Sequence, residues 1–417
     1  MKRYDLVVAG GGFAGTAAAI AAARRGLSVL LIDKSNCLGG AASNCLVQPF
    51  MLFTTNENGK TRDLCGGIFR EIGTELGKDN KFQTRGNDTF FHDEYLKLIL
   101  NRMTIDSGVE LLFHANVISA ERTGNRITSV TIADKSKKYT VFADYFIDAT
   151  GDANLAYMCG CSFRLGRNGD NLCQPMTLCF RLVNVDEDKI NRAEINKLYK
   201  EKKEVGAIKN PREDVLMFNT LMKGVVHFNT TRIVKLNPTD IFDVTRAEID
   251  ARVQMYEIFD FLKDNFSCFK NAEIVSSAAE IGIRESRMID GEYILTGEDL
   301  KKLTKFPDTI ALGNYDMDIH NPEGTGTSHY FFKNGEYYTI PYRSLIPKGM
   351  ENMLVAGRCI SVDHYAQSAI RIMPIVCCIG EAAGTAVAEA YESGCNVSQI
   401  DTEKLRTSLR NNGAYID

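Results

Sequence analysis

The sequence lacks a strong excess of charge of either sign. Its 417 residues carry 49 Lys and Arg against 53 Asp and Glu, for a net charge of −4. This near balance excludes a strongly basic nucleic-acid-binding protein, although it leaves room for a local basic patch. A hydrophobic content of 44% likewise excludes an acidic disordered chain. At about 150 residues per domain, the length predicts two or three globular domains.

Cysteine pairs with the Cys-x-x-Cys spacing are also missing. Twelve cysteines are scattered from Cys37 to Cys395, and none belongs to a Cys-x-x-Cys pair. This excludes a disulfide framework, and it excludes the chemistry of disulfide reductases, so neither Cys45 nor Cys359 is expected to act as a redox nucleophile. We interpret the cysteines as small buried hydrophobic residues in a reducing compartment, which favours the cytoplasm.

No unbroken apolar stretch is long enough to span a bilayer. The uncharged stretch from Leu6 to Ala23 follows two basic residues and so has the outline of a signal peptide. Glycines at positions 10, 11, 12 and 15 break it, however, into a buried strand at 6–9 and an Ala-rich helix at 13–25. We therefore expect no membrane span, and we find no internal repeat.

The same stretch carries a nucleotide-binding fingerprint. Gly10-x-Gly12-x-x-Gly15 lies between the predicted strand and helix, and the next strand, 27–32, ends at Asp33. In such a unit the glycines allow a tight turn, close approach of a pyrophosphate and close helix packing. The helix N-terminus attracts the phosphates, and the acidic residue accepts hydrogen bonds from an adenosine ribose. The pattern predicts an ADP-containing cofactor but does not separate NAD from FAD.

Other glycine-bearing segments favour a long, extended cofactor. The pair Gly39-Gly40 follows Asp33 closely and would let the chain run along the cofactor beyond its adenosine. A predicted strand at 145–149 leads into a Thr-Gly turn, and another at 352–356 leads to Gly357-Arg358. An apolar helix from about Pro374 to Ala390 follows, with Pro374 suited to its first turn.

Two other groups of residues show part of a binding-site pattern but lack the rest of it. Gly66-Gly67 opens a helix without a preceding strand, and Gly324-x-Gly326 has no third glycine, so a built-in NAD(P)H domain is not expected. Asp316, Asp318 and His320 alternate along the chain, which indicates a polar loop or strand, and we expect no metal site. The electron acceptor stays unidentified.

These motifs together resemble the FAD-dependent oxidoreductases of the glutathione-reductase-type superfamily, in particular the single-FAD-domain group with a Gly-x-Arg-Glu-Ser/Thr-Arg signature. The matching segments run in order through nearly the whole chain: Gly10 to Gly15, Asp33 to Gly40, Ala149 to Asp152, Gln174 to Thr177, Gly282 to Arg287, Ile340 to Arg343, Ala356 to Ser361, Arg371 to Pro374 and Gly380 to Gly384. The resemblance implies FAD as cofactor and a small-molecule substrate. It does not identify the substrate, and a homo-oligomer stays open.

The resemblance also implies which residues contact FAD. They are Gly10, Gly12, Phe13, Ala14, Gly15, Asp33, Lys34, Gly39, Gly40, Ala41, Val117, Ala149, Thr150, Gly151, Asp152, Gly357, Arg358, Arg371, Ile372, Met373 and Gly380. The helix that begins near Ile372 would turn its N-terminus towards the flavin N1–C2=O edge, and Arg371 would add a full charge. The alternative for Arg371 is a surface ion pair at a helix start.

The implied architecture is α/β and interleaved. A Rossmann-like FAD-binding domain, made of a parallel sheet and a β-meander, would use residues 1–160 and 341–417. An α+β substrate or cap domain, 161–340, would be inserted into it. Turn signals within 109–143 support the meander, and the charged periodic stretches 187–205 and 239–264 predict surface helices.

Substrate-handling residues are predicted from their chemistry. Arg284, Arg287 and Arg343 are candidate clamps for an anionic group, because guanidinium groups bind carboxylates bidentately. The alternative is an ion-pair network of these arginines with Glu280 or Glu285. Candidate proton-transfer groups are His320, His329, His364, Asp363 and Tyr338, of which His329 lies in a glycine-rich segment before an aromatic strand.

The leading hypothesis is a soluble FAD-dependent oxidoreductase that transfers hydride between flavin N5 and a small organic substrate, either anionic or polyhydroxylated. Two alternatives come from other classes. One is a flavin-dependent RNA-modifying enzyme, against which the net charge argues. The other is a non-catalytic protein that binds FAD or NAD.

Overall fold

The N-terminal strand, helix and strand form where the glycine pattern predicts them. In the computed structural model, which describes residues 2–416, β1 (Arg3–Ala9) leads into α1 (Phe13–Arg24) and then into β2 (Val29–Ile32). The two strands pair in parallel. Their side chains are almost all buried, because helices or loops cover both faces of a parallel sheet, and this explains the unbroken Leu and Val runs.

These strands belong to a seven-stranded sheet of mixed direction. Its order is β7 (Glu110–Leu112), β2, β1, β10 (Lys138–Asp148), β9 (Arg126–Ala133) and β8 (Asn116–Thr123), and β21 (Met353–Val355) also pairs with β10. The second half of β10 lies parallel to β1 and β21, whereas its first half lies antiparallel to β9. The parallel sheet and the β-meander are therefore one continuous structure, which confirms the predicted Rossmann-like fold.

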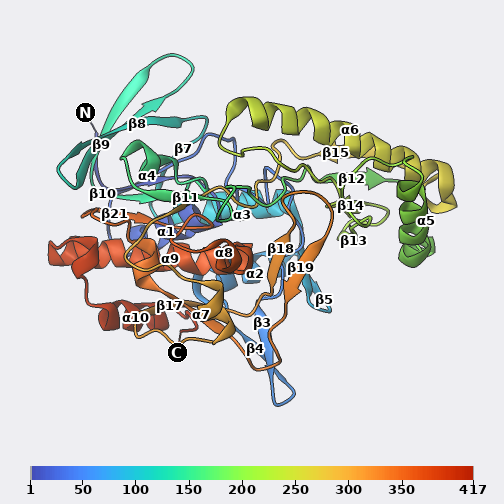
Figure 1. Ribbon diagram of the computed structural model, residues 1–417. Coiled ribbons are helices and arrows are strands. Elements are labelled where there is room, and N and C mark those ends of the chain that lie inside the picture. The colour runs from blue at the N-terminus through green and yellow to red at the C-terminus, as the bar shows by residue number, and fades with distance from the viewer. Residues whose placement is uncertain (1, 417) are drawn as a thin grey trace.

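Helix α9 (Met373–Ser393) packs against α1 in the centre of the protein (Figure 1). The approach is close because two glycines face backbone. A Cβ on Gly380 would lie 2.0 Å from the carbonyl oxygen of Ala14, and one on Gly384 would lie 2.1 Å from that of Ala18. Such contacts leave no room for a side chain. Helix α9, near the C-terminus, is therefore packed directly against the N-terminal helix α1.

Two further helices cover this pair. Helix α2 (Gly67–Lys78) packs against α9 and against α3 (Asp93–Asp106), and α10 (Thr402–Asn411) packs against the far part of α9. Among the described residues, α9 is the one helix that is long and apolar enough to cross a membrane, but its apolar window is wholly buried inside the protein. That is the setting of a core helix.

A second, smaller sheet forms away from the first. Its order is β13 (Met217–Asn219), β14 (Val226–Phe228), β12 (Phe180–Val183) and β15 (Glu273–Ser277). Helices α5 (Arg192–Glu204) and α6 (Ile241–Asn265) lie on the outside beside it (Figure 1). Their bounds are close to those of the surface helices predicted at 187–205 and 239–264. Phe180 and Phe228 stack across neighbouring strands with ring centroids 4.8 Å apart.

The remaining elements pack around or between these two parts. They are β3 (Thr54–Glu57), β4 (Lys60–Asp63), β5 (Phe82–Arg85), β6 (Asp88–Phe91), α4 (Asn154–Met158), β11 (Phe163–Leu165), β16 (Arg287–Ile289), α7 (Gly297–Lys301), β17 (Thr309–Gly313), β18 (Met317–His320), β19 (Thr327–Tyr330), β20 (Tyr338–Pro341) and α8 (His364–Ile370). Strands β18 and β19 form an antiparallel hairpin between the two parts (Figure 1).

The hydrophobic residues pack in one large core and two smaller ones. The large core holds α1, α9 and the seven-stranded sheet, and it also takes in buried residues from Met288 to Ile346. The buried members of the second core all lie between Phe180 and Ala272, so this stretch of the chain has a core of its own. All twelve cysteines are free thiols, and nine of them are buried, as expected for small hydrophobic residues.

The contact between α1 and α9 yields a first prediction. Replacing Gly384 with Ala should lower the free energy of unfolding by about 1–3 kcal/mol, because the new methyl group collides with the Ala18 carbonyl. The matched control is Gly77→Ala in α2, where an added Cβ meets nothing within 4 Å. There the better helix propensity of Ala should stabilise the protein by up to about 1 kcal/mol. Urea unfolding of both variants measures the difference, and equal stabilities would contradict the close contact.

A buried carboxyl group links α2 to α9. Oε2 of Glu381, on α9, accepts a hydrogen bond of 2.9 Å from the Ile68 N–H at the start of α2. Burial, with a smaller contribution from the nearby Glu71, raises the pKa of Glu381 to about 7. The folded protein therefore binds this proton more tightly than the unfolded chain, so stability falls as pH rises from about 4.5 to about 7.

Replacing Glu381 with Gln should remove this dependence. The Gln carbonyl can still accept the Ile68 hydrogen bond but carries no charge above pH 7. We expect the variant to be more stable than the wild type by about 1–3 kcal/mol at pH 8, and close to it at pH 5. Thermal unfolding at the two pH values measures this, and a variant less stable at pH 8 would show that the charged carboxylate is the stabilising form.

Candidate functional site

The fingerprint loop is built so that only glycine fits at two of its positions. Gly10 has a φ of +101°, and a Cβ there would lie 2.4 Å from the carbonyl oxygen of Ala149. A Cβ on Gly15 would lie 1.8 Å from the carbonyl oxygen of Gly10. The loop, the first turn of α1 and the end of β10 therefore lie in direct contact, as the fingerprint predicts.

The second glycine pair meets the same loop. Gly12 and Gly39 form a parallel bridge, and a Cβ on Gly40 would lie 2.9 Å from the Cα of Gly12. No side chain caps the N-terminus of α1 at Gly12. The first N–H groups of the helix are therefore not capped by a side chain, and only glycine backbone lies beside them. A pyrophosphate can bind to such exposed helix N–H groups.

Asp33 lies at the end of β2, beside the loop. Its carboxylate accepts hydrogen bonds from the N–H of Gly11 and from the N–H and hydroxyl group of Ser35. Lys34, in contrast, turns away to an ion pair of 2.9 Å with Glu280. The carboxylate stands where an adenosine ribose is expected, while the Lys34 ammonium is engaged with the inserted segment.

Two predicted residues flank this region. The N–H of Ala115 donates to the carbonyl oxygen of Asp33 over 3.1 Å, so β8 and its partly buried Val117 begin beside the ribose position. Ala41 is exposed, and its carbonyl oxygen accepts the N–H of Val47 over 3.0 Å. Both residues therefore lie on segments that border the fingerprint loop.

The Thr-Gly turn after β10 is held by a buried carboxylate. Asp148 accepts hydrogen bonds from the N–H and hydroxyl group of Thr150, and burial raises its pKa. A Cβ on Gly151 would lie 2.4 Å from Nη1 of Arg358, whose Nη2 donates to Asp152 over 2.6 Å. Nε of Arg358 is buried without a hydrogen-bond partner among the described residues. The turn thus packs against the Arg358 guanidinium group, whose Nε–H is available to donate a hydrogen bond to a ligand.

The C-terminal strand and helix reach the same place. Gly357 has a φ of +104°, and a Cβ there would lie 3.5 Å from the Cβ of Ala14. Helix α9 begins after Ile372, and no side chain caps its N-terminus. Ile372 and Met373 are buried. Gly380 lies two turns further along, where the structure gives it a packing role against α1.

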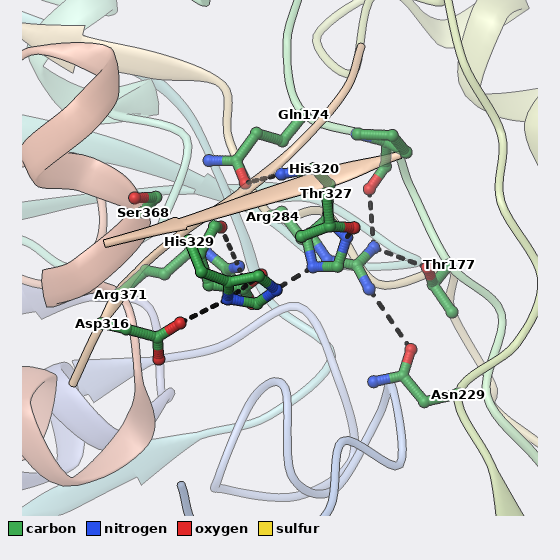
Figure 2. Close-up of polar contacts among 12 residues, drawn as sticks. Gln174, Thr177, Asn229, Arg284, Asp316, His320, Thr327, His329, Ser368 and Arg371 are labelled. Atoms are coloured by element: carbon green, nitrogen blue, oxygen red, sulfur yellow. Dashed lines mark hydrogen bonds and ion pairs between the residues drawn. The ribbon is translucent and has the colours of Figure 1, made fainter. Parts of the chain in front are cut away.

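Beside this helix lies a group of charged residues that we call the cationic cluster: Arg284, Arg371, Arg232, Arg212, Asp318 and His320. Figure 2 shows Arg284, His320 and Arg371 gathered around one centre. Nη1 of Arg284 donates to the carbonyl oxygen of Pro175 over 2.7 Å and to Oγ1 of Thr177 over 2.5 Å. Burial and the nearby cations Arg371 and Arg212 lower the pKa of Arg284 to about 9. An anion bound there would relieve this repulsion.

Three carboxylates partly balance these cations: Glu213 pairs with Arg232 over 3.2 Å, Asp214 pairs with Arg212 over 3.0 Å, and Asp318 lies beside Arg371. Burial alone would raise the pKa of Asp318, but a hydrogen bond from His320 and the charges of Arg371 and Arg284 hold it well below its usual value. Burial lowers the pKa of His320 to about 3, so its ring is neutral. Its Nδ1 accepts from Arg232 over 2.9 Å, and its Nε2 faces Asp318 over 3.2 Å. With both nitrogens engaged, His320 is not free to act as a base.

His329 forms a separate pair with Asp316. Its Nδ1 lies 2.5 Å from Oδ2 of Asp316 (Figure 2). Its ring stacks on Phe331 with centroids 5.2 Å apart. Burial raises the pKa of Asp316, although the hydrogen bond from His329 opposes this. His329 lies within β19 rather than in the loop that its glycines suggest. A carboxylate that accepts the Nδ1 proton leaves Nε2 free to accept another.

Two predicted clamps lie apart from the cluster. The segment around residues 284 to 287 is not helical, so Arg284 and Arg287 do not share a face. Arg287 donates to the carbonyl oxygen of Asp152 over 3.0 Å and stacks on Tyr157 at 4.3 Å. Arg343 forms a half-exposed ion pair of 2.9 Å with Asp308. In these contacts both arginines hold the fold together.

The predicted residues Asp363 and His364 also make structural contacts. Asp363 caps α8 by accepting the N–H of Ala366 over 2.7 Å. Nδ1 of His364 lies 2.7 Å from Glu285, which is fully buried. Glu285 thus pairs with a histidine, and the alternative network of Arg284 with Glu280 or Glu285 does not form.

Sequence reasoning missed the polar residues that support Arg284. Gln174 donates to Gln367 over 2.9 Å, and Gln367 donates to the carbonyl oxygen of Arg284 over 2.7 Å. Arg232, only 1% exposed, completes the cluster from the inserted segment. It is the single Lys, Arg, Asp or Glu between Gly224 and Val234, and a lone charge in such a stretch was the available signal.

Metal ligands do not gather in this region. Across residues 2–416, no three His, Cys, Asp or Glu side chains lie together in a way that could hold a metal ion. Asp318 pairs with His320 and Asp316 with His329, and Nδ1 of His329 also lies 3.9 Å from Oδ1 of Asp318.

Known proteins share this architecture. The sequence profile of a family described as FAD dependent oxidoreductase matches residues 5–409. No curated protein matches the chain. Among solved structures, a geranylgeranyl bacteriochlorophyll reductase-like protein from Thermoplasma acidophilum superposes with a TM-score of 0.50 at 13% identity, over 99% of this chain and 85% of that one. This likeness shows the fold.

Two other solved structures resemble the chain more weakly. A p-nitrophenol 4-monooxygenase from Pseudomonas putida DLL-E4 has a TM-score of 0.49 at 11% identity, over 95% of this chain and 82% of that one. The flavin-dependent brominase Bmp2 has a TM-score of 0.46 at 14% identity, over 98% and 83%.

The residues present are suited to FAD, the cofactor that the family match shows. The fingerprint loop and the Gly40 crossing leave bare backbone for a pyrophosphate, and Asp33 offers a carboxylate to a ribose. Arg358 has an unused buried donor, and α9 has an uncapped N-terminus. These groups come from both ends of the chain, as an extended dinucleotide requires.

Removing the Asp33 carboxylate tests the ribose position. Asp33→Ala should weaken FAD binding about tenfold, or about 1.4 kcal/mol, because the ribose hydroxyl groups lose their acceptor. The control is Asp144→Ala, which removes a carboxylate that pairs with Arg3 on the surface. Titration of the apoprotein with FAD, followed by flavin fluorescence, gives both affinities. Equal affinities for the two variants would place the ribose elsewhere.

Proposed function

The chain belongs to the FAD dependent oxidoreductase family, and from this premise we propose that it transfers hydride between a small organic substrate and flavin N5. The substrate is anionic, or polyhydroxylated with an anionic group. We propose that residues 1–160 and 341–417 hold FAD and that residues 161–340 supply the wall that faces the substrate. Twelve free cysteines support a reducing, cytoplasmic setting.

One observation carries this proposal: the cationic cluster adjoins the start of α9. Arg371, the residue before the N-cap of that helix, contacts Oδ2 of Asp318 over 3.4 Å, and Asp318 contacts His320 over 3.2 Å. Arg284 lies in the same cluster. In flavoproteins of this type, the N-terminus of such a helix faces the flavin ring. The cations therefore lie beside the place where a flavin and its substrate would meet.

We assign each side chain of the cluster its own role in substrate binding. When bound, FAD supplies a hydride acceptor or donor at N5. Arg284 binds the anionic group of the substrate, because its fork is incompletely used and the surrounding cations favour an anion. Thr177 and Asn229 hold the guanidinium group in place, with Nη2 of Arg284 donating to Asn229 over 3.3 Å. Substrate orientation follows from this clamp.

Proton transfer falls to His329. Asp316 holds the imidazole through Nδ1, which leaves Nε2 to take a proton from a substrate hydroxyl or amine group, or to return one. The side chain of His329 is 38% exposed, so the ring can exchange that proton with solvent. His320 stays neutral and acts as a fixed donor to Asp318.

Anaerobic bleaching of the bound flavin tests these roles. A panel of hydroxy acids, amino acids and sugar acids would be screened for reduction of the FAD-loaded protein. With the best reductant, Arg284→Met should raise the half-saturating concentration at least tenfold. His329→Gln should slow bleaching about 10²–10⁴-fold with little change in half-saturation.

The matched control is Arg343→Met. It removes a guanidinium group of the same kind, but one that pairs with Asp308 at the surface of the fold. We expect wild-type bleaching from it. If all three variants bleach like the wild type, neither Arg284 nor His329 handles the substrate, and the assignment is wrong.

A further inference from the structure

A cavity of about 640 Å³ lies outside the cationic cluster. It opens between the β3–β4 hairpin, α2, the β5–β6 hairpin and the segment that follows β19. Its volume is within the range of about 300–1,000 Å³ that is typical of small-molecule sites. None of the residues predicted to bind FAD or substrate lines it. It is therefore a second place where a ligand could lie.

The lining of the cavity is polar but nearly uncharged. Six threonines and four asparagines line it, against only three charged residues, Asp63, Arg70 and Lys333. Hydroxyl and amide groups both donate and accept hydrogen bonds, so they suit a ligand whose groups do the same. With one carboxylate and two cations, the cavity wall carries little net charge and does not favour a highly charged ligand. The chemistry indicates a neutral ligand rich in hydroxyl groups.

Aromatic rings supply the apolar part of the wall. Phe53, Phe82 and Phe332 line the cavity and are each only partly buried, and the buried Phe69 packs edge-on against Phe53 at 5.1 Å. Partly exposed rings gain free energy when an apolar ligand face covers them. A sugar ring combines one such face of C–H groups with a rim of hydroxyl groups. The cavity pairs the same two surfaces.

One buried polar atom points to a missing ligand group. Asn314 lines the cavity and is 7% exposed. Its Nδ2 donates to the carbonyl oxygen of Thr54 over 2.6 Å, but its Oδ1 accepts no hydrogen bond from any described residue. An unpaired buried acceptor destabilises the protein unless a partner satisfies it. A ligand hydroxyl group would be such a partner.

We propose that this cavity is a binding site for a neutral sugar. The sugar stacks on the phenylalanine rings and donates a hydroxyl hydrogen to Oδ1 of Asn314. The site lies close in sequence to the proton-transfer pair, because Asn314 precedes Asp316 by two residues and Phe332 follows His329 by three. The sugar is either a free monosaccharide or oligosaccharide, or the remote unit of a larger substrate.

The test is binding to the oxidised, FAD-loaded protein, without turnover. The probes are methyl glycosides of glucose, galactose and mannose, together with maltotriose and cellotriose. Glucose 6-phosphate serves as the charged analogue and cyclohexanol as the apolar one. Saturation-transfer NMR and calorimetric titration detect binding. We expect at least one neutral sugar to saturate with a Kd below about 1 mM, and both analogues to bind at least tenfold more weakly.

Two variants locate the site. Thr74→Trp places a large ring at an exposed position on the cavity wall, and Asn314→Leu removes the unpaired acceptor at similar volume. Each should weaken the sugar at least tenfold. The control is Lys78→Trp, an equally large change at an exposed position of α2 that does not line the cavity. It should bind like the wild type, and all three should keep the flavin spectrum.

The outcomes separate this proposal from the proposed function. Arg284→Met and His329→Gln should bind the sugar with wild-type affinity, whether or not the two substitutions change the rate of flavin bleaching by the substrate. A free sugar that leaves flavin bleaching by the substrate unchanged shows an independent site, and one that competes with the substrate shows a subsite for its remote unit. The proposal is overturned if no neutral sugar saturates, if Thr74→Trp binds as tightly as the wild type, or if glucose 6-phosphate binds best.

Discussion

The structure depends on the contact between α1 and α9, where two helices from opposite ends of the chain meet backbone to backbone. Gly380 and Gly384 allow it by leaving Ala14 and Ala18 uncovered, and the Ala-rich sequence of both helices keeps the interface thin. This contact places the N-terminus of α9 and the turn at Gly357 beside the fingerprint loop. Without it, the parts of the dinucleotide site would come from two unconnected units.

The cationic cluster is the second unusual feature, because it concentrates charge where burial makes charge costly. Arg284 and Arg371 lie beside one carboxylate, Asp318, and one neutral histidine, whereas Arg232 pairs with Glu213 and Arg212 with Asp214. Packing alone does not explain such a group, since an apolar set of similar size would be at least as stable. An arrangement that is unfavourable by itself and relieved by an anion is characteristic of a binding site.

The sequence predicts local and periodic features well and the long-range ones poorly. The fingerprint loop, the strand at 145–149 and the apolar helix at 374–390 follow from glycine spacing and apolar runs, and the structure confirms them. Side-chain partners do not follow from spacing. Arg287 and Arg343 have the chemistry of clamps, yet Asp152 and Asp308, each far away in sequence, engage them. Gln174 lies in a segment that matches the family, but neither its contact with Gln367 on α8 nor that of Arg232 with His320 on β18 follows from the sequence, because each partner lies more than 80 residues away.

Strand β10 has a consequence for how the protein is made. Its last residues pair with β21, more than 200 residues downstream, so a nascent chain on the ribosome can form the β-meander and pair β7, β2, β1 and β10 long before β21 completes the sheet. Until β21 and α9 emerge, the alanine face of α1 has no covering and remains open to chaperones or to misassociation. Synthesis therefore passes through a stage in which most of the sequence exists but α1 lacks its partner helix, and the fold is completed only after β21 and α9 have been made.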